Sequence, residues 1–120
     1  DLERRNRYEK QLREKIKEIA EKNKLEYSIS EDTNSDPRYC AKWIKDIMHE
    51  EAKKLSLDTP ELMSGPFHDS LALSYACDYG MIFVQSKDGI SHNPLEYSSP
   101  DHLAKGAQLL LQTVSEILKK

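Results

Sequence analysis

Apolar residues recur at helical spacing near the start of the chain. Tyr8, Leu12, Ile16 and Ile19 are separated mostly by charged residues. This period predicts an amphipathic helix over residues 1–24, with one apolar face and a solvated outer face.

Three further helices are predicted. Asp36 and Pro37 are typical of an N-cap and a first helical position, and so predict a second helix. Its apolar face comprises Cys40, Trp43, Ile44, Ile47, Met48 and Leu55. Residues 71–77 predict a short buried helix. Ser99 and Pro100 predict the start of a last helix. The apolar face of that helix comprises Leu103, Ala107, Leu110, Leu111, Val114, Ile117 and Leu118.

Two stretches have the pattern of β-strands. Residues 25–29 alternate apolar and polar side chains, which predicts a half-buried strand. Residues 81–84 (MIFV) form a continuous apolar run, which predicts a buried strand of a parallel sheet. Asp88 and Gly89 then predict a turn. This order of elements indicates an α/β fold class.

The polar loop at residues 31–36 is the predicted boundary between two units. Neither unit has enough strands to form a sheet by itself, and a lone strand cannot satisfy its own backbone groups. The chain also begins without Met, inside a helical pattern. We therefore expect a fragment of a longer chain, or strands that pair between copies.

Composition narrows the class of protein. The net charge of -3 argues against a nucleic-acid partner. No apolar run approaches the length that crosses a bilayer, and no signal peptide is visible in the charged start of the chain. Cys40 and Cys77 lie far apart in apolar patterns, which predicts two buried free thiols in a reducing cytoplasm.

His92 is the strongest candidate for site chemistry. It lies in a loop just beyond the predicted 81–84 strand, between Gly89 and Pro94, which stiffen the loop. Neutral imidazole is a common ligand of divalent metals. Glu96 either supports this histidine or caps the next turn. One histidine does not make a metal site, because such sites need three or more ligands.

The other histidines have more ordinary interpretations. His68, followed by Asp69, is an oriented base, a ligand pair or a loop hydrogen bond, and Asp69 can equally cap the helix beginning at Ser70. Gly65 allows close approach of a ligand or only makes a turn. His49 and His102 are expected at the surface.

Three motifs, in order, carry a family resemblance. They are SGPFHDS at residues 64–70, MIFVQS at 81–86, and GISHNP at 89–94 followed by Glu96. Residues 37–118 resemble the C-terminal part of dinuclear-metal amidohydrolases: N-carbamoyl-L-amino acid hydrolases, allantoate amidohydrolases and β-ureidopropionases. These belong to the aminoacylase and carboxypeptidase-type metallopeptidase superfamily.

The resemblance implies a fragment of a two-domain fold. Residues 1–31 would be the last helix and strand of a ferredoxin-like lid that makes a homodimer. Residues 36–120 would be the C-terminal part of an α/β metal-hydrolase catalytic domain that holds two metals, zinc or manganese. Self-association of the fragment is also expected, because the first helix and the 25–29 strand need partners.

The resemblance also implies site roles. His92 matches a metal ligand, and Ser64, Gly65, His68 and Asp69 match a loop that closes on the substrate. The implied reaction is hydrolysis of a carbamoyl or ureido C–N bond in a small molecule. The general base and the other metal ligands lie outside this chain. No residue here is therefore assigned as catalytic, and the chain alone is expected to be inactive.

Some positions differ from the family pattern. Pro66 and Phe67 replace two small residues, and Gln85 replaces a proline. The family has an arginine near the start of this chain that binds the substrate carboxylate. Here that position reads as Glu3, followed by Arg4 and Arg5, so either the register shifts by one or this anion-binding residue is lost. Two alternatives therefore remain open. One is an aminoacylase or peptidase of the same superfamily, and the other is an inactive paralogue or fragment that acts only in assembly.

Overall fold

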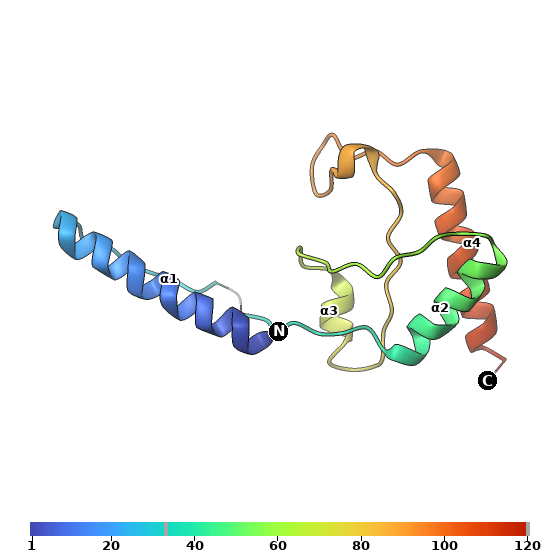
Figure 1. The fold of residues 1–120 in the computed structure, drawn as a ribbon, viewed down its shortest axis with the longest axis horizontal. Coiled ribbons are helices and arrows are strands. Elements are labelled where there is room, and N and C mark those ends of the chain that lie inside the picture. Colours follow the sequence, from blue (N-terminus) through green and yellow to red (C-terminus); the bar gives the residue numbers. More distant parts are fainter. Residues whose placement is uncertain (33, 120) are drawn as a thin grey trace. The chain divides into compact units, whose positions relative to one another are not determined.

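The structure is a computed structural model that describes residues 1–32 and 34–119, and over these ranges it is helical (Figure 1). Its elements are α1 (Leu2–Asn23), α2 (Lys42–Lys54), α3 (Asp69–Leu73), the 3₁₀ turn η1 (Lys87–Gly89) and α4 (Pro100–Ile117). The chain divides into two compact units, Asp1–Arg38 and Tyr39–Lys120. Thr33, part of the predicted 31–36 loop, lies outside the described residues. None of the described helices is long and apolar enough to span a membrane.

Helix α1 confirms the amphipathic helix predicted for residues 1–24. The Asp1 side chain caps it by accepting a hydrogen bond from the backbone N–H of Arg4 at 3.2 Å. Lys24 ends it in the left-handed conformation, with φ 53°. Only Ala20 of this helix is buried, and the predicted apolar positions Tyr8 and Leu12 are exposed.

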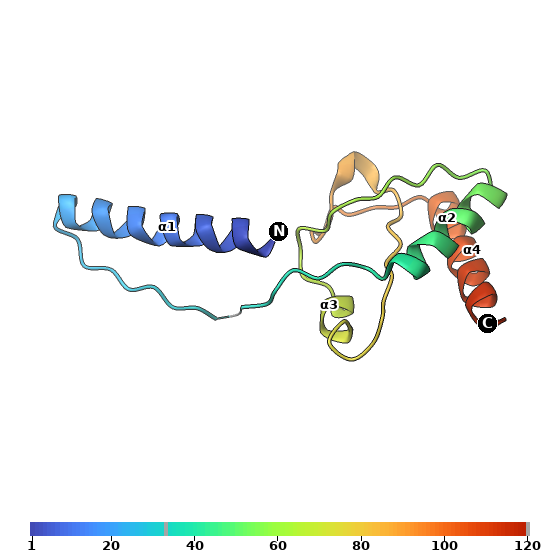
Figure 2. The ribbon, with the colours of Figure 1, turned by 60° about the horizontal axis from the view of Figure 1, so that its bottom comes forward.

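The segment after α1 folds back along the helix (Figure 2). Arg13 Nη2 donates to Glu31 Oε2 at 3.1 Å, and Arg5 Nη1 donates to the backbone carbonyl of Ser35 at 2.8 Å. The strand predicted at residues 25–29 is not formed, because no described residue adds a strand beside it. An extended segment without such a neighbour has no ladder of backbone hydrogen bonds.

The core of the second unit lies between α2 and α4, the described elements that contact each other. Its buried side chains are Ile44, Ile47, Glu51 and Ala52 of α2 and Leu109 and Thr113 of α4. The predicted face of α2 is therefore confirmed at Ile44 and Ile47. The predicted face of α4 is largely exposed, with Leu111 at 66% and Leu118 at 80%. Helix α4 instead turns Leu109 and Thr113 inward.

The second helix begins later than predicted. Asp36 does not cap it; its carboxylate lies 3.7 Å from Arg5 Nη2 instead. The backbone N–H of Ala41 donates to the carbonyl of Tyr79 at 2.8 Å, and Ala41 is extended. Since that bond holds the approach to the helix in an extended form, the helix starts only at Lys42, and the carbonyl of Ala41 accepts the backbone N–H of Lys45 at 3.1 Å.

The short helix predicted at residues 71–77 lies at residues 69–73 and is not buried. Within the described ranges, no helix packs on it closely enough to cover Leu73 or Tyr75, which are both exposed.

The prediction of two buried thiols is also wrong. Cys77 is exposed and Cys40 is only partly buried, and both are free.

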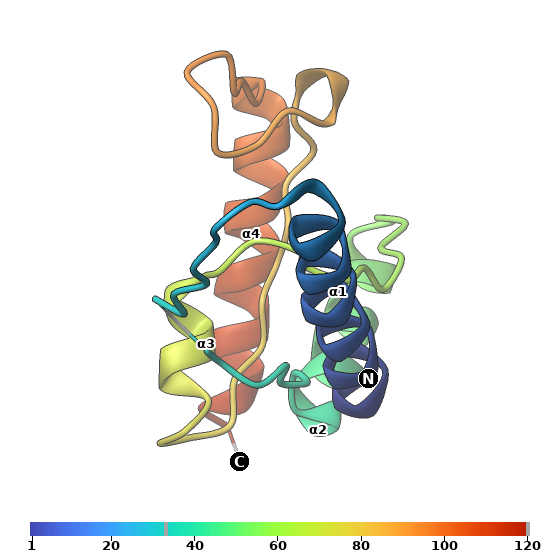
Figure 3. The same ribbon diagram turned by 90° about the vertical axis from the view of Figure 1, so that its left-hand side faces the viewer.

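Residues 78–86 run beside α4 as an extended segment (Figure 3). A Cβ added at Gly80 would lie 2.6 Å from Ile44 Cγ2, so the segment lies tight against α2 at this end. Val84 packs on Gly106 of α4 at the other end. The predicted buried strand at residues 81–84 is wrong in two respects. It has no strand neighbour in the described ranges, and Phe83 and Val84 are exposed.

The predicted α/β class therefore appears here only as its helices. Sheet formation requires several strands from separate parts of a chain. The two predicted strands lie in different units, 1–38 and 39–120, and neither has a partner strand among the described residues.

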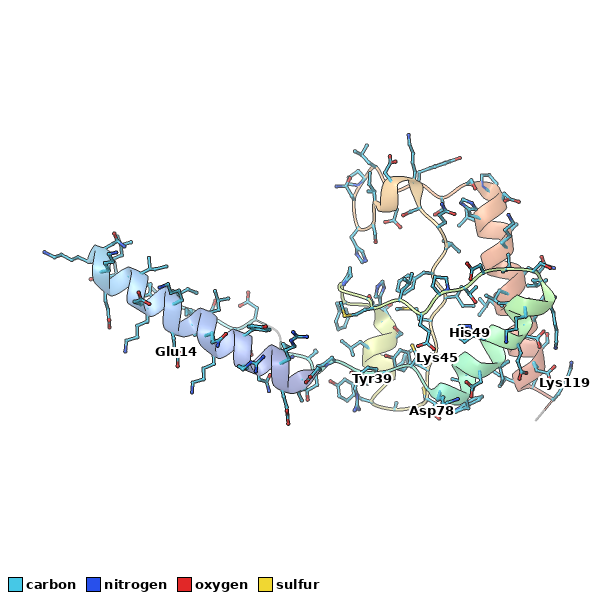
Figure 4. All side chains as sticks on the ribbon, in the orientation of Figure 1. Glu14, Tyr39, Lys45, His49, Asp78 and Lys119 are labelled. Atoms are coloured by element: carbon cyan, nitrogen blue, oxygen red, sulfur yellow. The ribbon has the colours of Figure 1, made fainter. Side chains whose placement is uncertain are left out.

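Polar contacts link residues 59–61, which precede the 64–69 loop, to α2. Lys45 and His49 lie on one side of that helix (Figure 4). Lys45 Nζ donates to Glu61 Oε2 at 2.7 Å, and His49 Nε2 lies 3.5 Å from Glu61 Oε1. Thr59 Oγ1 is 3.4 Å from His49 Nδ1. The hydrogen bond from Lys45 holds the pKa of Glu61 below its ordinary 4.5.

We expect the coupling between Lys45 and Glu61 to depend on pH. Because the folded-state pKa of Glu61 is lowered, its contribution is present above pH 4.5 and is lost as the pH falls through the folded value. A double-mutant cycle of Lys45→Met and Glu61→Gln, followed by denaturant melts, should show favourable coupling at neutral pH and none in acid. Asp101→Asn, which breaks the similar Asp101–Lys105 pair on α4, should leave that coupling unchanged.

Candidate functional site

Two histidines that are far apart in the sequence meet in the second unit. The rings of His68 and His92 pack edge to face, with centroids 5.4 Å apart and an interplanar angle of 64°. His68 immediately precedes α3, and His92 lies in the loop after η1. The motifs that contain the two histidines therefore form one site, which we call the His68–His92 pair.

The ring of His68 is held on a second side by Phe83. Their centroids lie 6.0 Å apart at 71°. The Nε2 atom of His68 is buried and has no hydrogen-bond partner among the described residues. Such an unpaired buried atom costs free energy. The contact with Phe83 was not predicted, because Phe83 lies in a run of apolar residues whose pattern indicates only a strand.

The loop that carries His92 is closed at its base. The backbone N–H of Lys87 donates to the carbonyl of Tyr97 at 2.8 Å. The predicted turn at Asp88 and Gly89 is confirmed as η1, and both residues have positive φ, 56° and 68°. Glycine adopts this conformation without steric cost, which explains its place in the turn.

Glu96 contacts the histidine in an unexpected way. Its Oε2 atom accepts a hydrogen bond from the backbone N–H of His92 at 2.7 Å. The carboxylate therefore binds the backbone N–H of His92 and neither of its ring nitrogens. Of the two roles predicted for Glu96, support of His92 agrees with this contact.

The remaining predicted site residues lie around the His68 turn. Ser64 Oγ donates to the carbonyl of Pro66 at 3.1 Å, which folds the turn on itself. Gly65 faces open space, since a Cβ there would meet no atom within 4 Å. Asp69 is the first residue of α3, and the N-cap position belongs to His68, so the prediction that Asp69 caps a helix from Ser70 is wrong.

The side chains at this site match part of a metal centre. The His92 side chain is exposed, so its imidazole can reach a ligand. Among residues 1–32 and 34–119, no group of three His, Cys, Asp or Glu side chains is arranged to hold a metal ion. The described residues can therefore contribute a histidine ligand but do not form a complete metal centre.

Comparison with known proteins tests the family resemblance inferred from the motifs. No family model matches the chain. It is 32% identical over 114 residues, 95% of its length, to the N-carbamoyl-L-amino-acid amidohydrolase of Pseudomonas sp. (strain NS671). It is 36% identical over 118 residues, 98% of its length, to the ureidoglycolate hydrolase of Arabidopsis thaliana. It is 36% identical over 55 residues, 46% of its length, to the allantoate deiminase of Arabidopsis thaliana.

The predicted resemblance is confirmed. This chain is homologous to hydrolases named for carbamoyl and ureido compounds. It spans 28% of the Pseudomonas protein, 25% of the Arabidopsis ureidoglycolate hydrolase and 10% of the allantoate deiminase. The chain therefore spans about a quarter or less of the length of these relatives.

Proposed function

We propose that the full-length protein is a metal-dependent hydrolase of C–N bonds in N-carbamoyl amino acids or ureido compounds. In this proposal the chain supplies His92 as a metal ligand and the 64–69 turn as part of the substrate wall. The observation that carries it is the meeting of the His68 and His92 rings at 5.4 Å. Homology to amidohydrolases gives the reaction class.

The residues of this chain would each have a limited task. A divalent metal, zinc or manganese, would supply Lewis-acid activation of water. His92 would contribute one imidazole ligand, with two metals in each full-length subunit. His68 would form part of the substrate wall, with its ring held by Phe83. Ser64, Gly65 and Asp69 would shape the turn that brings His68 to the substrate.

The overall reaction adds water across the carbamoyl C–N bond. The amino nitrogen gains a proton and leaves as the free amino acid, and the carbonyl carbon gains the hydroxyl as carbamic acid. Carbamic acid then breaks down to carbon dioxide and ammonia. The general base of this reaction would lie outside the described residues.

A substrate panel tests the proposal on full-length protein. We expect ammonia release from N-carbamoyl amino acids, allantoate or ureidoglycolate, its loss after treatment with a chelator, and its return when Zn²⁺ or Mn²⁺ is added. Absence of hydrolysis across the panel, or hydrolysis that a chelator leaves unchanged, would contradict it.

A hydrolase of acylated amino acids or peptides is the second candidate. The exposed ring of Phe67, at 60%, favours it, because that ring offers apolar surface beside the His68 turn. Such surface suits an acyl chain or a peptide side chain better than a carbamoyl group. Including N-acetyl amino acids and dipeptides in the panel distinguishes the two.

We also propose that the full-length protein is a homodimer. Three apolar side chains of the 25–29 segment, Leu25, Tyr27 and Ile29, are exposed, and the apolar face of α1 is exposed too. An unpaired extended segment of this kind readily adds to a neighbouring strand. Light scattering of the full-length protein tests this point, and a monomeric mass would contradict it.

A further inference from the structure

We propose that Glu96 is a positioning residue for His92, a role that rests on the proposed metal-binding function of that histidine. The Glu96 carboxylate receives the His92 backbone N–H at 2.7 Å. Hydrogen bonds to an ionised acceptor are shorter and stronger than neutral ones. The bond fixes the direction of the His92 side chain without using either ring nitrogen.

His92 needs such a support because its backbone is strained. Its φ is 54°, in the left-handed region that side chains other than glycine rarely adopt. This conformation carries a steric cost for an L-residue. It persists where the surroundings over-determine it. If Glu96 did not hold the N–H, His92 would relax toward negative φ and its ring would point elsewhere.

The other contacts of the loop do not replace this one. Asn93 Oδ1 accepts from the backbone N–H of Leu95 at 3.0 Å, and the Asn93 carbonyl accepts from the N–H of Glu96 at 2.9 Å. Both bonds shape the turn after His92 and bring Glu96 back toward it. The bond from Glu96 holds the backbone of His92, and the contact with His68 limits its ring.

The test uses full-length protein and its affinity for Zn²⁺, measured by competition with a chromophoric chelator. We expect Glu96→Ala to weaken the affinity about 10- to 100-fold, as loss of a group that orients a metal ligand does. Glu96→Gln keeps the acceptor oxygen but not the charge, and should lose about fivefold. Glu50→Ala removes an exposed carboxylate of α2 and should change nothing. If Glu96→Ala does not fold, Glu96→Asp, which is one methylene shorter, takes its place.

A second readout needs no metal. In metal-free protein labelled with ¹⁵N-histidine, the His92 amide proton should resonate downfield, as expected for a bond to a carboxylate, and Glu96→Ala should move it upfield. The His92→Ala spectrum assigns the signal. If His92→Ala leaves the Zn²⁺ affinity unchanged, the proposed function fails. If His92→Ala weakens it but Glu96→Ala behaves as Glu50→Ala in both readouts, the positioning role is overturned and the metal function stands.

Discussion

Replacing His92 by alanine in the full-length protein is expected to lower kcat/KM by at least about 100-fold, and to remove one bound metal ion per subunit. Loss of a group that only orients a ligand costs 10- to 100-fold, and loss of the ligand itself should cost no less. The exposed ring has no described partner except the edge of His68, so the substitution removes little packing. Metal analysis and steady-state kinetics on the same samples measure both effects.

His49→Ala is the matched control. That histidine lies on α2 and contacts Thr59 and Glu61 instead of the His68–His92 pair. It should keep the full metal content and near-normal turnover. Normal metal content and turnover in His92→Ala would remove His92 from the metal site, and equal losses in the two variants would point to a general effect on folding.

Gly80→Ala is expected to lower the free energy of unfolding by about 1–3 kcal/mol, the usual cost of forcing extra volume into a packed contact. The added Cβ would lie 2.6 Å from Ile44 Cγ2 and 2.7 Å from Met48 Cε. The Met48 side chain can move aside, but the Ile44 methyl belongs to a buried, β-branched residue of α2. Denaturant unfolding measures the loss.

Gly65→Ala provides the comparison for Gly80→Ala. The same methyl at Gly65 would meet no atom within 4 Å. Alanine restricts the unfolded chain more than glycine does. Gly65→Ala should therefore leave the free energy of unfolding unchanged, or raise it by up to about 1 kcal/mol. If the two variants have equal stability, the 78–86 segment is not seated on α2 in the way described.

Local signals in the sequence predicted the helices well. At the start of α4, Ser99 accepts a hydrogen bond from the backbone N–H of His102 at 3.2 Å, which is the expected cap. Asp36 has the same kind of signal but pairs with Arg5, 31 residues earlier in the chain. A capping pattern cannot reveal a distant partner that competes for the same carboxylate.

The strands failed for a related reason. The alternation at residues 25–29 and the apolar run at 81–84 are patterns that suit strands within a sheet. They do not provide the neighbouring strand. Both strand predictions were therefore wrong, because the partners of a β-ladder are not encoded within either stretch.

The site was predicted at the level of motifs but not of contacts. The His68 and His92 loops could be singled out from glycine, proline and their flanking residues. The two rings touch, and Phe83 holds one of them, because residues 78–86 pack on α2 at Gly80 and on α4 at Val84. The bond from Glu96 to the His92 backbone depends on a left-handed residue that no composition signal marks.

The open edge of residues 81–84 has a practical consequence for handling the protein. Residues 81–86 (MIFVQS) form a six-residue window without charge or proline, and four of its residues are apolar, which is typical of aggregation-prone segments. Within the described ranges no strand covers them, and Phe83 and Val84 remain partly exposed at 46% and 38%. Production of this chain by itself should therefore favour inclusion bodies. Val84→Lys would act as a gatekeeper charge, at the expense of the contact with Gly106.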